Sequence, residues 1–283
     1  KRWEHERFRS ASQLRRMSKR SKQYMIKYLV RAVRTVRRRY IPDKWAGLPA
    51  ARATYKWAVR HVPSLERKGV PVDIGGYGYF RVHPSLAIGT YNFEQWGKGH
   101  NAGFVQWIEA CRGRKCVFDI GAHIGLYALP ASKVLFPDGR LYAFEPADAN
   151  REFLARHIAY NAISNIEIVP DLVGDIEKRE VEFFETDAVH GMNTIAQNSV
   201  THKNKTSPFR KTMKNQISLD DFCRERNIAP EVLKIDVEGG ELKIFQGAGE
   251  VLRRAHPVIF LSVHPAHLLH LGSSSEELHG LIR

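Results

Sequence analysis

From Cys116 onward, the chain alternates short apolar runs with longer segments of helical pattern. The apolar runs predict strands at residues 116–121, 140–145, 166–170, 232–237 and 257–263. The other segments predict helices at residues 125–136, 148–161, 239–253 and 266–283. Strands that alternate with helices in this way are typical of a parallel sheet covered by helices. We therefore expect an α/β fold built around one parallel sheet.

Two segments depart from this alternation. Pro130 falls inside the first expected helix, where a proline removes a hydrogen bond and clashes with the preceding turn. That helix therefore either starts late, with Pro130 in its first turn, or is kinked. Residues 187–216 are polar and locally basic, and an excursion of that length is typical of disorder or of a functional lid. Ser218, which follows it, is expected to cap a short helix.

The positive charge of the chain is concentrated near its N-terminal end. The formal net charge is +14, from 44 Lys and Arg against 30 Asp and Glu. Residues 1–60 contain 19 of the basic residues and 3 of the acidic ones, so the remainder is close to neutral. The basic excess belongs to an extension, and no basic groove for nucleic acid is implied for the rest of the chain.

The extension carries an amphipathic pattern. Within residues 12–41, apolar side chains recur on one face of a predicted helix whose other face is almost wholly Arg and Lys. Such a helix either attaches to an anionic membrane surface or a partner, or docks on its own domain. We expect three regions: a basic helical extension with its linker (1–60), a small pre-domain of strands and a helix (61–115), and the domain with the parallel sheet (116–283).

Cysteine usage and hydropathy bear on where the protein resides. Cys111, Cys116 and Cys223 show no metal-ligand spacing, and their odd number favours a reducing compartment. No apolar run approaches the length of a membrane span. We expect a cytoplasmic protein, with peripheral membrane contact through residues 12–41 as the alternative.

A glycine loop, "FDIGAHIGLYALPASK", covers the end of the first strand and the segment after it. In an open parallel sheet, ligands collect at the carboxyl ends of the strands. Gly121 lets the chain turn away without a side chain that blocks a ligand, and Gly125 permits close approach to the next helix. Asp119 either braces this loop or reaches a cationic group of the ligand.

An acidic residue twenty positions later completes the pattern. Glu145 ends the second strand in "RLYAFEP", where a carboxylate accepts hydrogen bonds from both hydroxyls of a ribose. This combination fits either a dinucleotide or S-adenosylmethionine. Dinucleotide sites use G-x-G-x-x-G, because the second glycine admits a pyrophosphate. His123 stands at that place here and would crowd a pyrophosphate, so the spacing favours S-adenosylmethionine.

A second polar cluster ends the fourth strand in "EVLKIDVEGGELKIFQGA". Asp236 and Glu238 lie two apart on an extended segment that also carries Lys234, so both carboxylates point to one side. Paired carboxylates there hold the amino group of a ligand, take a proton from a hydroxyl, or bind a metal. Glu241 is interpreted as a first-turn helix residue favoured by the helix dipole.

Taken in order, these motifs resemble the FkbM-type methyltransferases. The matching stretches are "FDIGAHIGLYALPASK", "LYAFEP", "NAISNIEIVPDLVGD", "SLDDFC", "LKIDVEGGELKIFQGA" and "VIFLSVHP". The resemblance covers roughly residues 70 to 270 and implies a Rossmann-like class I methyltransferase that uses S-adenosyl-L-methionine. It also implies a hydroxyl acceptor on a sugar or natural product. The family's sheet normally ends with two further strands, so either the chain is truncated or its sheet is incomplete.

The resemblance also implies which residues form the site. The positions for the donor are Asp119, Gly121, His123 and Gly125 in the glycine loop, Glu145 for the ribose and Asp171 for the adenine side. Asp236 and Glu238 fall at the reaction edge, and no metal ligand is assigned. Two departures are mild: His123 stands where the family usually has asparagine, and Gly240 where it usually has alanine.

Transfer of a methyl group to an alcohol needs near-attack geometry and a base that accepts the hydroxyl proton. The candidates for the base are Asp236 and His264, which ends the fifth strand in "SVHP". Residues 190–195 either close over the acceptor or form an ordinary loop.

Two other functions remain open from the sequence. The basic extension suggests an RNA-directed methyltransferase, which would bind RNA in a salt-sensitive manner. Alternatively, the domain is a catalytically silent Rossmann-like module tethered through residues 12–41. The oligomeric state is not predicted.

Overall fold

The computed structural model describes residues 64–88, 93, 96, 97, 101, 103–187, 189, 191, 193–195 and 209–282. The basic extension and its expected helix within residues 12–41 lie outside the described residues. The described residues fall into two compact units, the first from residues 64–72 and 81–88 and the second from the others. The three regions expected from the sequence remain a prediction.

Short elements precede the main sheet. They are the helices α4 (Ser64–Lys68), α5 (Pro84–Ile88) and α6 (Phe104–Cys111), and the strands β1 (Val70–Asp73) and β2 (Tyr79–Val82). The two strands pair with each other. Glycines with positive φ at Gly75, Gly76 and Gly78 form the turn between them.

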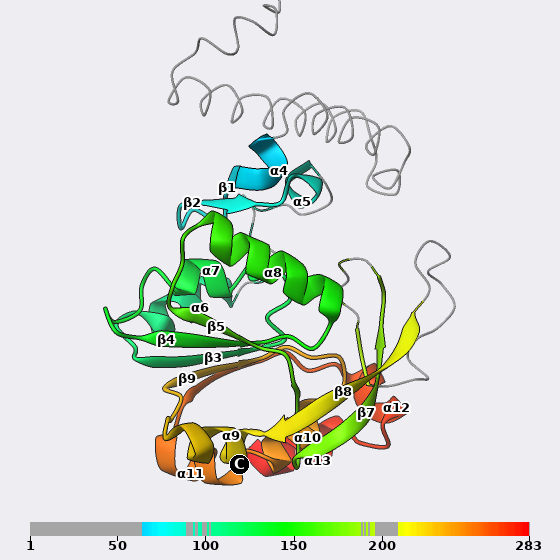
Figure 1. Ribbon diagram of the computed structural model, residues 1–283. Helices are drawn as coiled ribbons and strands as arrows, with labels where there is room; N and C mark the ends of the chain where they lie inside the picture. Colours follow the sequence, from blue (N-terminus) through cyan, green and yellow to red (C-terminus); the bar gives the residue numbers. More distant parts are fainter. Residues whose placement is uncertain are drawn as a thin grey trace, which may run out of the picture. The chain divides into compact units, whose positions relative to one another are not determined.

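In the described part of the chain, five strands form the parallel sheet that the sequence predicted. They are β3 (Cys116–Ile120), β4 (Arg140–Phe144), β5 (Ile166–Val169), β9 (Val232–Ile235) and β10 (Val258–Leu261). Their order in the sheet is β10-β9-β3-β4-β5 (Figure 1). Along the chain, β4 and then β5 are added on one side of β3, and β9 and then β10 are added on its other side. The point where the order reverses lies between β3 and β9, which is where open α/β sheets bind ligands.

Helices cover both faces of this sheet (Figure 1). On one side lie α6, α7 (Ala128–Ala131) and α8 (Asp148–Tyr160). On the other lie α9 (Leu219–Arg226), α10 (Glu241–Gln246), α11 (Gly249–Ala255), α12 (Pro265–His270) and α13 (Ser275–Ile282).

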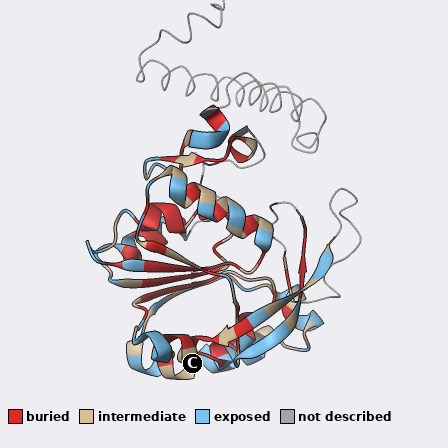
Figure 2. Ribbon diagram, viewed as in Figure 1, coloured by how far each residue is buried: buried red, intermediate tan, exposed pale blue. Residues whose placement is uncertain are grey.

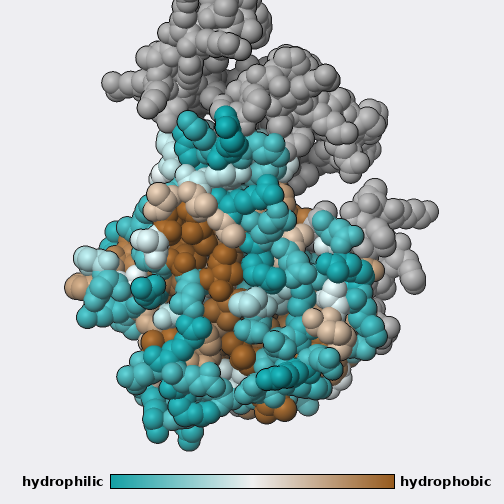
Figure 3. Space-filling view, viewed as in Figure 1, coloured by the Kyte–Doolittle hydropathy of each residue, from teal (hydrophilic) through white to brown (hydrophobic). Residues whose placement is uncertain are grey.

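The strands β3, β4 and β9 of the sheet are deeply buried, whereas β10 is partly exposed (Figure 2). Phe118 packs edge-on against Tyr142, Phe144 and Phe222, which joins α9 to β3 and β4. β9 is buried along its whole length, because helices cover both of its faces. On the face that Figure 3 shows, much of the apolar surface lies in a central band with hydrophilic surface on either side.

Three expected helices are shorter than the sequence pattern suggested, and the one predicted at 266–283 is split into α12 and α13. The helix predicted at 125–136 is reduced to α7. This helix starts late and has Pro130 in its first turn, which is one of the two arrangements predicted for a proline at this position. The helix predicted at 239–253 is split into α10 and α11. At the break, a Cβ on Gly247 would lie 2.1 Å from the carbonyl oxygen of Gly174. The carboxylate of Asp220 in α9 accepts hydrogen bonds from the backbone N–H groups that begin α11.

A smaller sheet was not predicted. It consists of β6 (Leu172–Gly174), β7 (Lys178–Glu185) and β8 (Arg210–Ser218), in the order β6-β8-β7 within the described residues. The expectation of a lid or disorder throughout 187–216 is therefore wrong for 210–216, which form most of β8. Ser218 caps α9 as predicted, since its Oγ accepts a hydrogen bond from the N–H of Asp221 at 3.0 Å.

No helix in the part of the chain that the structure describes is long and apolar enough to cross a membrane.

Candidate functional site

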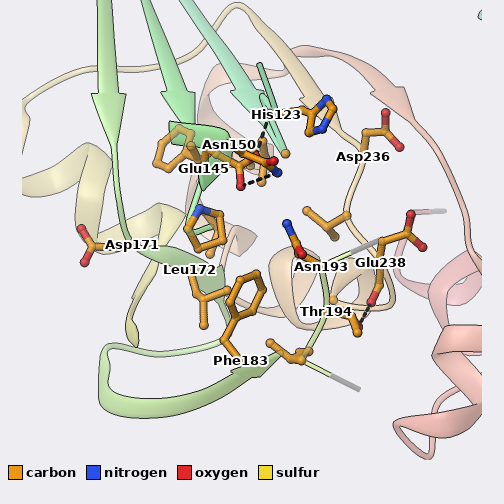
Figure 4. A pocket seen from close by; sticks show the side chains of 18 of the residues that line it. His123, Glu145, Asn150, Asp171, Leu172, Phe183, Asn193, Thr194, Asp236 and Glu238 are labelled. Carbon is orange, nitrogen blue, oxygen red and sulfur yellow. Dashed lines mark hydrogen bonds between the residues drawn. The ribbon is translucent and has the colours of Figure 1, made fainter. Parts of the chain in front are cut away.

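A cleft opens at the carboxyl ends of β3, β4 and β9 (Figure 4). The residues that line the cleft include Gly121, His123, Glu145, Asn150, Asp171, Leu172, Phe183, Asn193, Thr194, Asp236, Glu238 and Gly240. The structure thus brings six of the nine predicted site residues to one cavity.

Gly121 allows the segments after β3 and β9 to meet at the base of the cleft. Its φ is +80°, and a Cβ there would lie 2.0 Å from the carbonyl oxygen of Asp236. The N–H of Asp236 donates a hydrogen bond to Ile120 at 3.0 Å, so the two segments are held together. Only glycine tolerates both this φ and this contact.

Glu145 is the centre of a hydrogen-bond network on the wall formed by β4. Its Oε2 accepts a bond from the N–H of His123 at 2.7 Å. Its Oε1 accepts bonds from the N–H of Ala147 at 3.0 Å and from Nδ2 of Asn150 at 3.4 Å. Burial raises the pKa of Glu145 to about 7, although these hydrogen bonds act to lower it. Oε2 retains acceptor capacity for a ligand hydroxyl, because a carboxylate oxygen accepts two bonds.

His123 is held with a φ of +53°, a left-handed conformation that few non-glycine residues adopt. This conformation directs its N–H to Glu145. The side chain lies in the cleft wall, as Figure 4 shows. The backbone of the glycine loop is therefore tied to the acidic residue of the next strand.

Asp119 and Gly125 are not among the residues that line the cleft. Asp119 is completely buried, and its Oδ1 lies 3.2 Å from Nζ of Lys234. Gly125 has a φ of +89°, and a Cβ there would lie 2.7 Å from Leu154 of α8. Asp119 therefore braces the base of the site, and Gly125 permits close packing of the loop on α8.

Lys234 links Asp119 to the cleft. Its Nζ also lies 3.3 Å from Oδ2 of Asp236, and it sits 4.8 Å from the ring centre of Tyr127. Burial acts to lower the pKa of Lys234, but Asp119 and Asp236 outweigh it and raise this pKa above its ordinary value. Burial likewise acts to raise the pKa of Asp236, but Lys234 holds it below its usual range. Asp236 is thus kept ionised.

The far wall of the cleft is apolar. Leu172 in β6, Phe183 in β7 and Ile195 come from the part of the chain that includes the unpredicted sheet. Asp171 lies among the lining residues, half-buried, and this partial burial raises its pKa. Thr194 joins this wall to the reaction edge, because its Oγ1 donates to the carbonyl oxygen of Glu238 at 2.6 Å.

His264 lies beside the two carboxylates predicted at the reaction edge. Its Nε2 is 3.9 Å from Oδ1 of Asp236 and 3.9 Å from Oε1 of Glu238, so both carboxylates do point to one side. Nδ1 of His267 lies 3.4 Å from Oε2 of Glu238. Burial raises the pKa of Glu238, although the two histidines act to lower it. Two imidazoles and two carboxylates thus meet where β9 leaves the sheet.

The structure corrects the interpretation of Glu241. This residue does begin α10, but it is completely buried and its Oε1 lies 2.7 Å from Nδ1 of His264. The hydrogen bond to Glu241 raises the pKa of His264 above its ordinary value. No pattern in the sequence joins the two residues, because they are 23 positions apart on different elements.

Among the described residues, no group of three or more His, Cys, Asp and Glu side chains is arranged to hold a metal ion. The carboxylates at the reaction edge face lysine and histidine partners instead.

The chain is similar to solved structures of methyltransferases. The chain is similar to the crystal structure of methyltransferase FkbM from Methylobacillus flagellatus KT, with 19% identity over 60% of this chain and 38% of that one, and a TM-score of 0.39. It is also similar to precorrin-6y C5,15-methyltransferase from Geobacter metallireducens GS-15, with 14% identity over 63% of this chain and 69% of that one, and a TM-score of 0.35. No curated protein matches the chain.

The family is assigned from the sequence match rather than from these overlaps, whose TM-scores stay below 0.5. The methyltransferase FkbM domain matches residues 119–283, which include every predicted site residue. The resemblance found in the sequence motifs is thereby confirmed. Because the match covers more than half of the chain, the protein belongs to the FkbM family of methyltransferases, whose methyl donor is S-adenosyl-L-methionine.

Proposed function

We propose that this protein transfers the methyl group of S-adenosyl-L-methionine to a hydroxyl oxygen of a sugar, glycan or natural-product acceptor. The observation that carries the proposal is the position of His264, next to Asp236 and Glu238 at the edge of the cleft. An imidazole there is suited to remove a hydroxyl proton, because its ordinary pKa lies near neutral pH.

The residues of the cleft fit the donor. Oε2 of Glu145 is available to a ribose hydroxyl, and Leu172 and Phe183 provide an apolar wall for adenine. When bound, the donor supplies an electrophilic methyl group on a positively charged sulfur.

The charge at the reaction edge supports a neutral acceptor. Asp236 is held ionised, and Glu238 and Glu241 add two further carboxyl groups beside it. Phosphate groups of RNA would be repelled there, since like charges in a partly buried site interact strongly. A polyhydroxylated acceptor has hydroxyl groups that donate hydrogen bonds to such carboxylates.

Isotope labelling tests the proposed function. Purified protein is incubated with donor carrying a ¹³C-labelled methyl group and with a cell extract, and the products are analysed by mass spectrometry. We expect the label in an O-methyl group of a hydroxylated small molecule or glycan, and loss of labelling in Glu145→Ala. Label found only in RNA or protein, or no S-adenosylhomocysteine formed, would contradict the proposal.

Donor binding is expected to weaken in acid. A ribose hydroxyl donates to the ionised form of Glu145, whose pKa is about 7. The affinity should therefore be constant above that pH and fall by up to about tenfold for each pH unit below it. Calorimetric titration with S-adenosylhomocysteine between pH 5 and pH 9, values chosen to span that pKa by about two units on either side, measures this.

Glu145→Gln serves as the test of that assignment. It should bind more weakly than the wild-type protein above about pH 7, approach the wild-type affinity at lower pH, where Glu145 is itself protonated, and lose most of the pH dependence. His123→Asn, a variant at the neighbouring titratable residue, should keep the dependence. An unchanged pH profile in Glu145→Gln would remove Glu145 from the binding equilibrium.

Asp236→Ala is expected to slow methyl transfer by about tenfold to a hundredfold while donor affinity and the fold are largely retained. The variant removes a charge next to His264, but Lys234 keeps its partner Asp119. Turnover with the acceptor identified by labelling, together with S-adenosylhomocysteine affinity, separates the two effects. Unchanged turnover would exclude Asp236 from the mechanism.

A further inference from the structure

The contact between Glu241 and His264 has the geometry of a carboxylate that orients an imidazole. Oε1 of Glu241 lies 2.7 Å from Nδ1 of His264, and Glu241 has no exposed surface. Its Oε2 has no hydrogen-bond partner within the described residues. The imidazole is therefore the principal polar group that this buried carboxylate faces.

Burial decides which ring nitrogen of neutral His264 carries the proton. A buried carboxylate without a hydrogen-bond donor is costly, so the geometry favours a proton on Nδ1 directed at Glu241. Nε2 then keeps its lone pair. Nε2 is the nitrogen that faces the reaction edge, 3.9 Å from both Asp236 and Glu238.

The groups around His264 come from three elements. Glu241 belongs to α10, Asp236 and Glu238 to the segment that links β9 to α10, and His267 lies one turn along α12 with its ring centre 6.1 Å away. Asp236 is paired with Lys234, and its pKa is lowered. A carboxylate held ionised in this way is a weaker base than the imidazole beside it.

We propose that His264 is the general base of the transfer and that Glu241 is the residue that positions it. This inference rests on the proposed function and decides between the two bases that the sequence left open. Nε2 takes the proton of the acceptor hydroxyl as the oxygen forms its bond to the methyl carbon. The carbon–sulfur bond breaks with its electron pair on sulfur, and the positive charge passes to the imidazole, where Glu241 stabilises it.

Nitrogen NMR of the ¹⁵N-labelled protein bound to S-adenosylhomocysteine tests the arrangement without an acceptor. We expect neutral His264 to carry its proton on Nδ1, whereas free histidine prefers Nε2. We also expect it to titrate above its ordinary pKa, about 6.5. In Glu241→Gln, the titration should move to lower pH. A proton on Nε2 in the wild-type protein, or an unchanged titration in Glu241→Gln, would overturn the inference.

Glu276→Gln is a matched control, because Glu276 is an exposed acidic residue in the first turn of α13, as Glu241 is in the first turn of α10. If Glu241 acted only through the helix dipole, the two variants would behave alike. We expect the tautomer and titration of His264 to be unchanged in Glu276→Gln.

Turnover adds a second measurement. With the acceptor identified by labelling, Glu241→Gln should lower kcat by about tenfold to a hundredfold and shift the acid limb of its pH profile to lower pH. Its affinity for S-adenosylhomocysteine should stay unchanged, since Glu241 does not line the cleft. Failure of the proposed function would appear as label outside hydroxyl groups, whereas failure of this inference would appear in the tautomer of His264.

Discussion

Lys234→Met is expected to reduce the free energy of unfolding by about 3–5 kcal/mol, because it leaves a buried carboxylate without its counter-charge. Asp119 has no exposed surface, and Lys234 is the cation within 3.2 Å of it. Burial already raises the pKa of Asp119 while Lys234 acts to lower it. Methionine fills much of the lysine volume, so the loss comes from the charge rather than from a cavity.

Urea denaturation of the wild-type protein and the variant gives this free energy directly. The double variant Asp119→Asn/Lys234→Met is the control, since it removes both charges and should recover much of the loss. In Lys234→Met the pKa of Asp119 should rise further, so the folded protein binds a proton that the unfolded chain releases. The deficit should therefore shrink as pH falls. A loss below about 1 kcal/mol at neutral pH would show that the pair is not needed.

Gly121→Ala is expected to cost about 2–5 kcal/mol and to impair donor binding. A φ of +80° costs an alanine about 1–2 kcal/mol, and the added methyl group must displace the carbonyl of Asp236. That displacement would separate the ends of β3 and β9 and move Asp236 at the base of the cleft. Denaturation measures the first effect, and titration with S-adenosylhomocysteine measures the second.

Gly113→Ala is the control for Gly121→Ala, because it separates the cost of backbone strain from the cost of the contact with Asp236. Gly113 has a φ of +68°, but the described residues place no atom within 4 Å of a Cβ at that position. It should cost about 1–2 kcal/mol and leave donor binding unchanged. If the two variants lost the same free energy of unfolding, the carbonyl group of Asp236 would have to move aside in Gly121→Ala without cost.

The five strands of the main sheet were predicted to within about two residues at each end. Each is a short apolar run between polar or glycine-rich segments, as in Val232–Ile235. A strand that helices cover on both faces has a nearly continuous run of apolar residues, and this run can be recognised without knowing which strands pair with it. The capping role of Ser218 was predictable for the same reason, since its partner Asp221 lies three residues away.

The smaller sheet could not be predicted from local pattern. β8, "RKTMKNQIS", is polar along most of its length and becomes a strand because it pairs with β7 and β6. The break between α10 and α11 has a similar origin, since it depends on Asp220 from α9 and on the backbone of Gly174. In both cases, tertiary contacts outweigh local preference.

The sequence by itself determined the family, the parallel sheet and the chemistry at the strand ends, because strands and their flanking residues are encoded by neighbours along the chain. It placed Gly121, Glu145, Asp236 and Glu238 at what the structure shows to be one cleft. Only the tertiary structure decided that Asp119 is buried against Lys234 and that Glu241 meets His264. Those pairs join segments 115 and 23 residues apart, and a residue's burial and electrostatic partner depend on which segments the fold brings together.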